Sequence, residues 1–505
     1  MKKVIYPLML MLCLTSCSED LEQVNPNVVT QENFWQTEND ILSGFAATYK
    51  VLRDVNNGYW GVRGVELTNG RGDDFFIRND VSDLYQLSTF TNTPTTGTPS
   101  SMFTGFYTAI FRTNQIIENT PDADISEDLK TQFIAEAKFL RALNYFHLAI
   151  NFGSVSIITT VPQTREDYFI AKSSEEEVWV QVEEDLKAAV AGLPVSYPSE
   201  WVGRATKGAA IGYLGKAYLY QQKWAMAEEQ FAQLAGVAGE SVAPFNYDLL
   251  ADYGDNFIAG NDNNQESLFE IQNQNVGGTE PWAGENANES QGVTTAQEFA
   301  PTEAGGWFEA FPTNKMFEAF QQEKTVSGDF DPRMYASIVW DYPEAMYYNI
   351  PFSDYTSVFG EKSRIRKYQN WWQDDEGIWI SEINEKALRY ADVLLMYAEA
   401  ITMQGRAAEA YPLVNRIRNR ADLADLPLGY SQDEMMAEIR HQRMVEFFRE
   451  GLRFYDLKRW GLLEQEITNS DKTGREYFDP AKHDYFPIPQ DEINTNPEIE
   501  QNPNW

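Results

Sequence analysis

Apolar residues in two stretches near the C-terminal end recur at the spacing that places them on one face of an α-helix. The first stretch has Ala391, Leu394, Leu395, Ala398 and Ile401, and the second has Ala410, Leu413, Val414, Ile417 and Ala421. Gly405 lies between them. Because so short a connection makes two helices antiparallel neighbours, we expect them to bury these faces against each other.

A third helix is predicted to begin at Ser431, whose side chain can cap the first turn while Glu434 reaches back to it. Charged residues of both signs then alternate with aromatic ones: Arg443, Glu446, Glu450, Arg453, Asp456 and Arg459. Unpaired charges are costly beside bulky apolar rings, so we predict that these six side chains pair with one another. A carboxylate-rich active site is the alternative interpretation.

The N-terminal half also has the signals of helices. One helix is predicted to follow Thr37, a long one runs from Ser126 to Gly153, and another starts at Ser174. Residues 209–235 and 387–420 both resemble tetratricopeptide repeats. We therefore predict a mainly α protein, in which tetratricopeptide-like helix pairs form a scaffold for a loop-rich ligand-binding face and a few short strands.

Residues 245–381 break the helical pattern with many Gly, Asn and Trp residues around one predicted strand, 267–271. Long loops on a rigid scaffold are where binding sites usually lie. The predicted organisation is a signal peptide (1–16) followed by a body (17–505). The body consists of a tether (17–36), an N-terminal helical part (37–244), a loop-rich insertion (245–381) and a C-terminal helical part with a tail (382–505).

The first residues have the pattern of a secretion signal. Lys2 and Lys3 precede a short apolar run that is too short to span a bilayer. The run ends in Leu14-Thr15-Ser16-Cys17, which looks like a bacterial lipobox, so we predict that Cys17 carries lipid. An ordinary cleaved signal is the alternative. The remaining cysteine, Cys13, lies in the apolar run, and the exported protein is therefore expected to have no disulfide.

Composition narrows the possible functions. A formal charge of -36 over 505 residues argues against nucleic acid as a partner, since nucleic acid requires a basic surface. The sequence has no H-E-x-x-H, C-x-x-C, G-x-S-x-G or phosphate-binding glycine motif, and His147, His441 and His483 are far apart. We expect no catalytic residue, bound metal or cofactor.

Several motifs together resemble the SusD/RagB family of outer-membrane nutrient-binding lipoproteins from Bacteroidetes. They are LRYADVLLMYAEA at 388–400, EGLR at 450–453, DLKRW at 456–460, YFPIPQDEI at 485–493 and AEAKFLRA at 135–142. The resemblance implies a glycan-binding lipoprotein, anchored in the outer membrane through Cys17 and facing the cell exterior. It also implies a SusC-like, TonB-dependent transporter as partner.

The loops contain flat aromatic rings and polar side chains, the two kinds of group that bind the C–H faces and hydroxyls of sugars. Asp73 to Asn79 lies where family members place part of their ligand site, and Trp307 precedes Pro312 as a loop aromatic does in relatives. The predicted ligand-binding residues are Trp60, Asp73, Asp74, Phe75, Arg78, Asn79, Trp282, Trp307 and Trp340. Each Trp could instead anchor the core.

Two other functions are compatible with these features. Seventy-six acidic residues could supply the two carboxylates of a glycoside hydrolase, although no motif identifies such a pair. The helical repeats could also form a peptide-binding or assembly scaffold on the cell surface. The sequence names neither the glycan nor its linkage.

Overall fold

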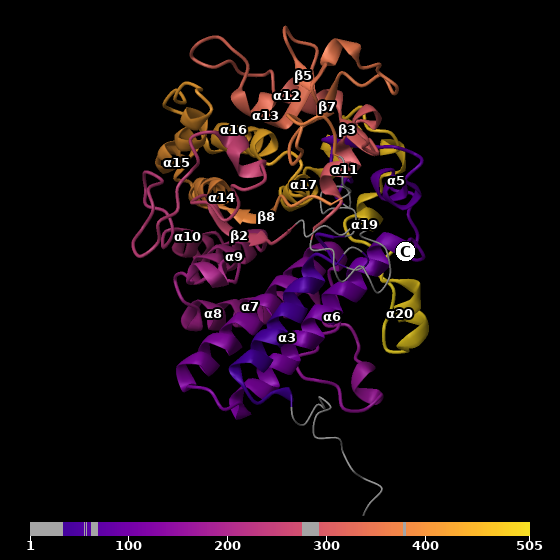
Figure 1. Ribbon diagram of the computed structural model, residues 1–505, viewed down its shortest axis with the longest axis vertical. Coiled ribbons are helices and arrows are strands. Elements are labelled where there is room, and N and C mark those ends of the chain that lie inside the picture. The colour runs from indigo at the N-terminus through magenta and orange to yellow at the C-terminus, as the bar shows by residue number, and fades with distance from the viewer. Residues whose placement is uncertain (1–33, 55, 57, 62–68, 275–291, 377–379) are drawn as a thin grey trace, which may run out of the picture.

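The computed structural model describes residues 34–505 apart from 55, 57, 62–68, 275–291 and 377–379 (Figure 1). The signal peptide, Cys17, most of the tether and Trp282 lie outside the described residues. The described chain is mainly helical with short strands, which confirms the predicted fold class. None of its helices combines the length and apolar character needed to cross a membrane.

The helices of the first half are α3 (Glu38–Leu52), α5 (Ser82–Ser88), α6 (Gly97–Asn119), α7 (Glu127–Phe152), α8 (Glu175–Gly192), α9 (Lys207–Tyr220) and α10 (Trp224–Phe231). The second half has α11 (Thr295–Phe299), α12 (Asn314–Ala319), α13 (Pro332–Ser337), α14 (Tyr390–Met403), α15 (Ala407–Arg420), α16 (Gln432–Glu446), α17 (Arg453–Arg459), α18 (Leu463–Thr468), α19 (Pro480–His483) and α20 (Gln490–Thr495). The strands are β1 (Phe75–Ile77), β2 (Ser267–Ile271), β3 (Ala310–Pro312), β4 (Ile338–Trp340), β5 (Met346–Tyr347), β6 (Ile350–Pro351), β7 (Ser363–Ile365) and β8 (Glu385–Arg389).

The long helices α3, α6, α7 and α8 lie side by side in the lower part of the molecule (Figure 1). The starts of α3, α7 and α8 follow the predicted signals. Thr37 and Ser174 form capping boxes with Asp40 and Glu177, and the Ser126 side chain accepts from the N–H of Leu129. These side chains satisfy donors that the first helical turn leaves unpaired, so local sequence fixes where these three helices begin, whereas α6 has no side-chain cap.

The helix pair α14–α15 forms as predicted. Gly405 lies in the turn between them with φ +79°, a conformation that disfavours other residues. The helix α10 packs against both α9 and α14, so the two tetratricopeptide-like pairs share one core. The strand β8, immediately before α14, pairs antiparallel with β2 and ties this core to the middle of the chain.

The middle of the chain forms the upper part of the molecule, drawn in orange in Figure 1. It is rich in loops, yet it contains the helices α11 to α13 and most of the short strands. Its buried residues Met316 and Ile338 belong to the same apolar cluster as Phe139 in α7 and Leu394 in α14. Most of the described chain thus shares one main core, and two smaller apolar clusters lie around Tyr347 and Tyr368. The domain boundaries that we predicted stay predictions.

The six charged residues predicted to pair with one another do so only in part. Asp456 binds Arg443 (2.8 Å) and Arg459 (2.9 Å), as expected. The others take partners from distant segments. Arg453 binds Asp73 at 2.7 Å, and Glu450 binds Arg389 at 2.8 Å. Sequence spacing identified the charges but not these partners, because the partners come from other elements of the fold.

His483, at the end of α19, gives the folded protein a defined sensitivity to acid. Its Nδ1 accepts from the backbone N–H of Asp479 at 2.9 Å, and its ring packs beside Phe90 and Trp505. Burial, together with the cation of Lys482, lowers the pKa of His483 to about 4. Below pH 6.5 the unfolded chain therefore binds a proton here that the folded chain does not, and stability falls as the pH falls towards 4.

We expect His483→Asn to reduce this sensitivity, because an amide can occupy the position of Nδ1 without titrating. Between pH 7 and pH 4.5 the parent should lose about 1 kcal/mol more unfolding free energy than the variant. Urea unfolding at a series of pH values measures the difference. Parallel pH curves for the two proteins would contradict this role for His483.

Candidate ligand-binding site

The antiparallel pairing of β1 with β3 brings together two stretches that the sequence analysis singled out separately. Phe76 faces Phe311 across the pair, and Ile77 faces Ala310. The backbone N–H of Arg78 extends the pairing by donating to the carbonyl of Glu309 at 2.9 Å. The predicted segment 73–79 therefore lies against residues 307–314.

Arg78 fixes the loop that leads into β3. Its Nη1 donates to the carbonyl oxygens of Trp307 (2.8 Å) and Phe308 (3.2 Å), and its Nη2 pairs with Asp80 at 2.5 Å. One guanidinium thus holds two backbone carbonyls and one carboxylate. Arg78 positions the Trp307 loop as well as contributing to the surface beside it.

An open pocket of about 540 Å³ adjoins this β1–β3 pair. Four aromatic side chains line it, one of which is Tyr85. The other three contact one another in order, and we call them the aromatic row: Phe76, Phe311 and Phe359. The centre of the Phe311 ring lies 5.2 Å from the centre of the Phe76 ring and 5.6 Å from that of the Phe359 ring. The planes of the Phe311 and Phe359 rings are 8° from parallel. Phe359 is 44% exposed and Phe76 is half-buried, whereas Phe311 is 8% exposed, so Phe359 and Phe76 supply the apolar surface that reaches solvent.

Polar side chains surround the aromatic row. Asn79 and Lys362 lie on the pocket wall, with Asn314, Asp471 and Thr473 from two other segments. The Arg78 guanidinium lies 5.0 Å from the centre of the Phe359 ring. A flat apolar surface bordered by hydrogen-bonding groups can hold a ligand that has an apolar face and a polar rim.

Asp73, Asp74 and Phe75 were predicted to contact ligand, and the structure instead buries all three. Asp73 binds Arg453 at 2.7 Å and Lys315 at 2.5 Å, and these cations hold the pKa of its carboxyl well below the usual range despite burial. Burial and the neighbouring Asp73 charge raise the pKa of Asp74. These three residues are buried and do not line the pocket.

Two of the predicted tryptophans also belong to the core. Trp60 is 3% exposed and packs against Tyr59 and His147, and Trp340 is 6% exposed among aromatic neighbours. The residues next to Trp60 and Trp340 in the sequence do not indicate whether these rings are buried or exposed. Trp307 is half-buried, and its backbone N–H donates to the carbonyl of Gln297 at 2.8 Å. A ligand contact by Trp307 stays a prediction, as does one by Trp282.

Phe76, Phe311, Phe359 and Lys362 line the pocket but were not among the ligand-binding residues predicted from the sequence. Phe359 had a usable signal, because an apolar Val358-Phe359 pair directly before Gly360 is unusual in a polar loop. Phe311 had none, since its position beside Phe359 depends on the β1–β3 pairing. Among the described residues, no group of three or more His, Cys, Asp and Glu side chains is placed to hold a metal ion.

The fold and the pocket define a class of protein: a helical-repeat scaffold that presents an aromatic, polar-edged pocket on its loops. Comparison with known proteins identifies the family. A family model described as "SusD family" matches residues 265–505, and one described as "Starch-binding associating with outer membrane" matches residues 21–219. The chain belongs to the SusD family, as the sequence motifs indicated.

Individual relatives agree over nearly the whole chain. SusD-like protein P2 of Formosa agariphila is 27% identical and covers 98% of both chains. The crystal structure of a SusD superfamily protein from Bacteroides vulgatus is 37% identical, with a TM-score of 0.85 over 94% of this chain and all of that one. A structure described as a laminarin binding SusD-like protein is 26% identical, with a TM-score of 0.78 over 93% of this chain and all of that one.

Proposed function

We propose that this protein is a cell-surface lipoprotein that binds oligosaccharide or polysaccharide and delivers it to a SusC-like, TonB-dependent transporter in the outer membrane. The observation that carries the proposal is the aromatic row on a SusD scaffold, with Phe359 exposed, bordered by amide, hydroxyl and charged groups. Support for glycan as the ligand class comes from the laminarin-binding relative. Support for the outer membrane comes from the description of the second family model.

The physical requirements of sugar binding match the pocket. Pyranose rings present C–H groups that pack on aromatic faces, and their hydroxyls need donors and acceptors at the edges. Two stacked rings at about 1 kcal/mol each and a few hydrogen bonds at about 1 kcal/mol each give roughly −4 to −6 kcal/mol. That range corresponds to dissociation constants from about a millimolar to tens of micromolar, which suits capture followed by release to a transporter.

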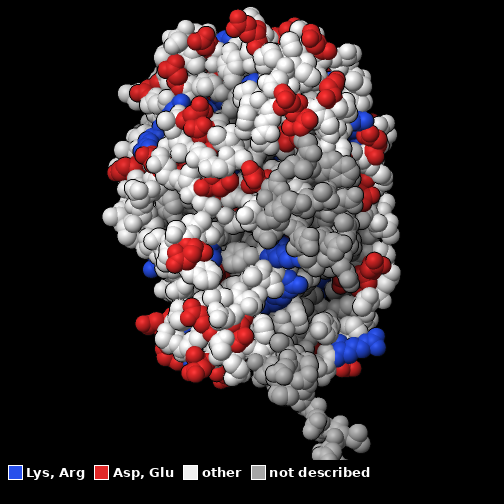
Figure 2. Space-filling model, viewed as in Figure 1, with Lys and Arg blue, Asp and Glu red and all other residues white. Residues whose placement is uncertain are grey.

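The charge of the protein favours an uncharged glycan. The formal charge is -36, and acidic side chains are spread over the upper and lower parts of the face shown in Figure 2. An anionic polysaccharide would meet this negative potential on approach, although salt screens it beyond about 10 Å. Neutral glycans avoid the repulsion.

We infer binding without hydrolysis. The two carboxylates that line the pocket, Glu361 and Asp471, are both engaged by nearby groups. Glu361 accepts from the backbone N–H of Phe359 at 2.8 Å, and Asp471 accepts from the amide side chain of Asn314 at 2.7 Å. These contacts hold the pocket loops in place, which is a structural role for both acids.

Phe359→Ala tests the site. We expect it to weaken glycan binding about tenfold, because it removes the exposed ring of the aromatic row. The measurement is isothermal titration calorimetry of the soluble form starting at Ser18 against neutral plant, microbial and host glycans, laminarin included. Trp201→Ala is the matched control, since Trp201 is a similarly exposed aromatic (40%) that does not line this pocket.

Three outcomes would contradict parts of the proposal. If Phe359→Ala and the parent bind glycan with equal affinity, the aromatic row is not part of the binding site. If the parent binds no glycan of the panel, glycan is not the ligand. Release of shortened products from a bound glycan would favour the glycoside hydrolase.

A further inference from the structure

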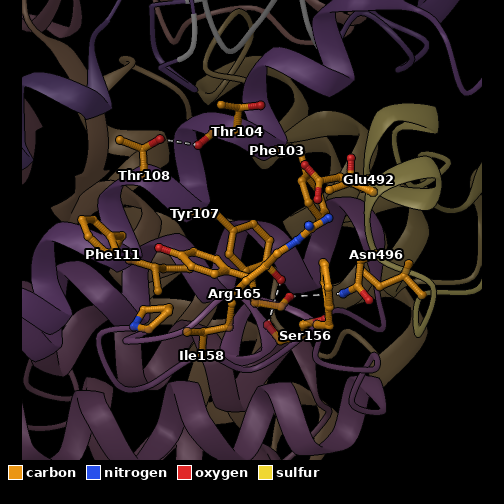
Figure 3. A pocket seen from close by; sticks show the side chains of 16 residues that line it. Phe103, Thr104, Tyr107, Thr108, Phe111, Ser156, Ile158, Arg165, Glu492 and Asn496 are labelled. Atoms are coloured by element: carbon orange, nitrogen blue, oxygen red, sulfur yellow. Dashed lines mark hydrogen bonds between the residues drawn. The ribbon is translucent and has the colours of Figure 1, made fainter.

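A second, separate pocket of about 620 Å³ lies where α6, the segment between α7 and α8, and α20 meet (Figure 3). It shares no residue with the glycan pocket. Phe103, Tyr107 and Phe111 line it from one face of α6, since residues four apart on a helix lie on the same side. Tyr168 and Phe169 line it from the opposite segment.

The walls of this pocket are fixed by hydrogen bonds. The Tyr107 hydroxyl donates to the carbonyl of Ser156 at 2.7 Å, and the buried Asn496 amide donates to the carbonyl of Ile170 at 3.1 Å. Within the described chain, Phe103 and Tyr107 are the one pair of lining rings in mutual contact, at 4.9 Å. Among the described residues, Phe111, Tyr168 and Phe169 form no ring contact with one another. Tyr168 is exposed, and Phe111 and Phe169 are half-buried, so part of each ring surface can contact a ligand.

Two opposite charges border the aromatic walls. Glu492 of α20 is half-buried, and no basic side chain in the described part of the chain is within ion-pair distance of it. Burial and the neighbouring Asp491 raise the pKa of its carboxyl, as expected for a carboxylate without a cation. Arg165 is exposed on the other wall, 5.5 Å from the Phe169 ring, and forms no ion pair with the described residues.

We propose that this pocket binds short peptides that have a free N-terminus and an apolar side chain. The peptide ammonium pairs with Glu492, the apolar side chain packs among the rings, and the peptide carboxylate pairs with Arg165. A neutral sugar leaves both charges unmatched, and a fatty acid leaves Glu492 unmatched. A zwitterionic ligand matches both charges, and the mainly aromatic walls require that it also carry apolar surface.

The test uses the dipeptide phenylalanylleucine, its N-acetylated form and its C-terminal amide, titrated calorimetrically into the soluble protein starting at Ser18. We expect the free dipeptide to bind with a dissociation constant between about 10 µM and 1 mM. N-acetylation should weaken binding about tenfold by removing the ammonium, and amidation should weaken it by a smaller factor because Arg165 is more exposed.

Two variants test which side chain binds each end of the peptide. Glu492→Gln should weaken the free dipeptide about tenfold and abolish its advantage over the acetylated form. Arg165→Gln should abolish the advantage of the free acid over the amide. Glu498→Gln is the matched control, because Glu498 is an exposed carboxylate that follows α20 and does not line the pocket.

Two results would overturn the proposal: no heat from the dipeptide with the parent protein, or binding that Glu492→Gln leaves unchanged. Glycan binding is measured in the same samples. Because Glu492→Gln leaves the aromatic row intact, it should not change glycan affinity. Peptide binding and glycan binding are therefore tested independently, and one proposal can fail while the other holds.

Discussion

Glu446→Gln is expected to lower the free energy of unfolding by about 3–5 kcal/mol, the cost of removing one partner from a buried ion pair. Glu446 is fully buried at the end of α16. Its Oε1 accepts from Arg389 at 2.7 Å and also from Arg420, and its Oε2 pairs with Arg333 at 3.2 Å. These three guanidinium groups hold the pKa of Glu446 well below its usual range.

The size of the effect follows from the surroundings of Glu446. Four cationic side chains, Arg333, Lys367, Arg389 and Arg420, interleave with four acidic ones, Glu266, Asp331, Glu446 and Glu450. Glutamine keeps the shape of Glu446 but removes one of the four negative charges. The cations then lose a counter-charge in a region that water cannot reach.

Chemical unfolding followed by circular dichroism measures the loss. Glu318→Gln is the matched control, because Glu318 is 71% exposed and lies 3.8 Å from the half-exposed Lys362. An exposed pair of this kind contributes at most about 1 kcal/mol. A loss below about 1 kcal/mol for Glu446→Gln would show that the buried cluster is not the main electrostatic contribution to this part of the fold.

Cys17→Ala is expected to move nearly all of the protein from the membrane fraction to the soluble fraction of the cell. The prediction rests on the likeness of Leu14-Thr15-Ser16-Cys17 to a bacterial lipobox. Acyl chains contribute about 0.8 kcal/mol per buried CH₂, so losing several of them removes the attachment. None of the helices in the described part of the chain could replace the lipid by crossing the membrane.

Cell fractionation followed by immunoblotting measures the distribution of each variant. Cys13→Ala is the matched control, because Cys13 lies in the apolar run of the signal, four positions before the predicted acylation site. It should leave the protein in the membrane fraction. Retention of Cys17→Ala in the membrane, or release of Cys13→Ala, would argue against the lipobox.

The helices were largely predictable because their signals are local. Thr37, Ser126, Ser174 and Ser431 each cap the helix that was predicted to follow them. The helix predicted to begin at Ser431 is α16, which ends at Glu446. Gly451 has φ +70° in the turn that follows, so the glycine marks a turn without marking the end of the helix.

The candidate site was less predictable. The segment 73–79 lies at the pocket, but of the predicted residues that the structure describes, only Arg78 and Asn79 line it. Alternation along β1 sends Phe76 outward and Phe75 inward, and a shift of one residue would have exchanged them. Which residue faces outward is decided by the register with β3, whose residues lie more than two hundred positions away.

The sequence by itself determined the family, the mainly α class and the starts of several helices, because periodicity, caps and motifs are properties of neighbouring residues. The export signal that it predicts stays a prediction. Only the tertiary structure decided which aromatic rings reach solvent and which charges meet. Arg453 pairs with Asp73 across 380 residues of chain, and Phe359 completes a surface begun by Phe76 and Phe311. Such contacts depend on how distant elements pack, and residue spacing carries no record of that packing.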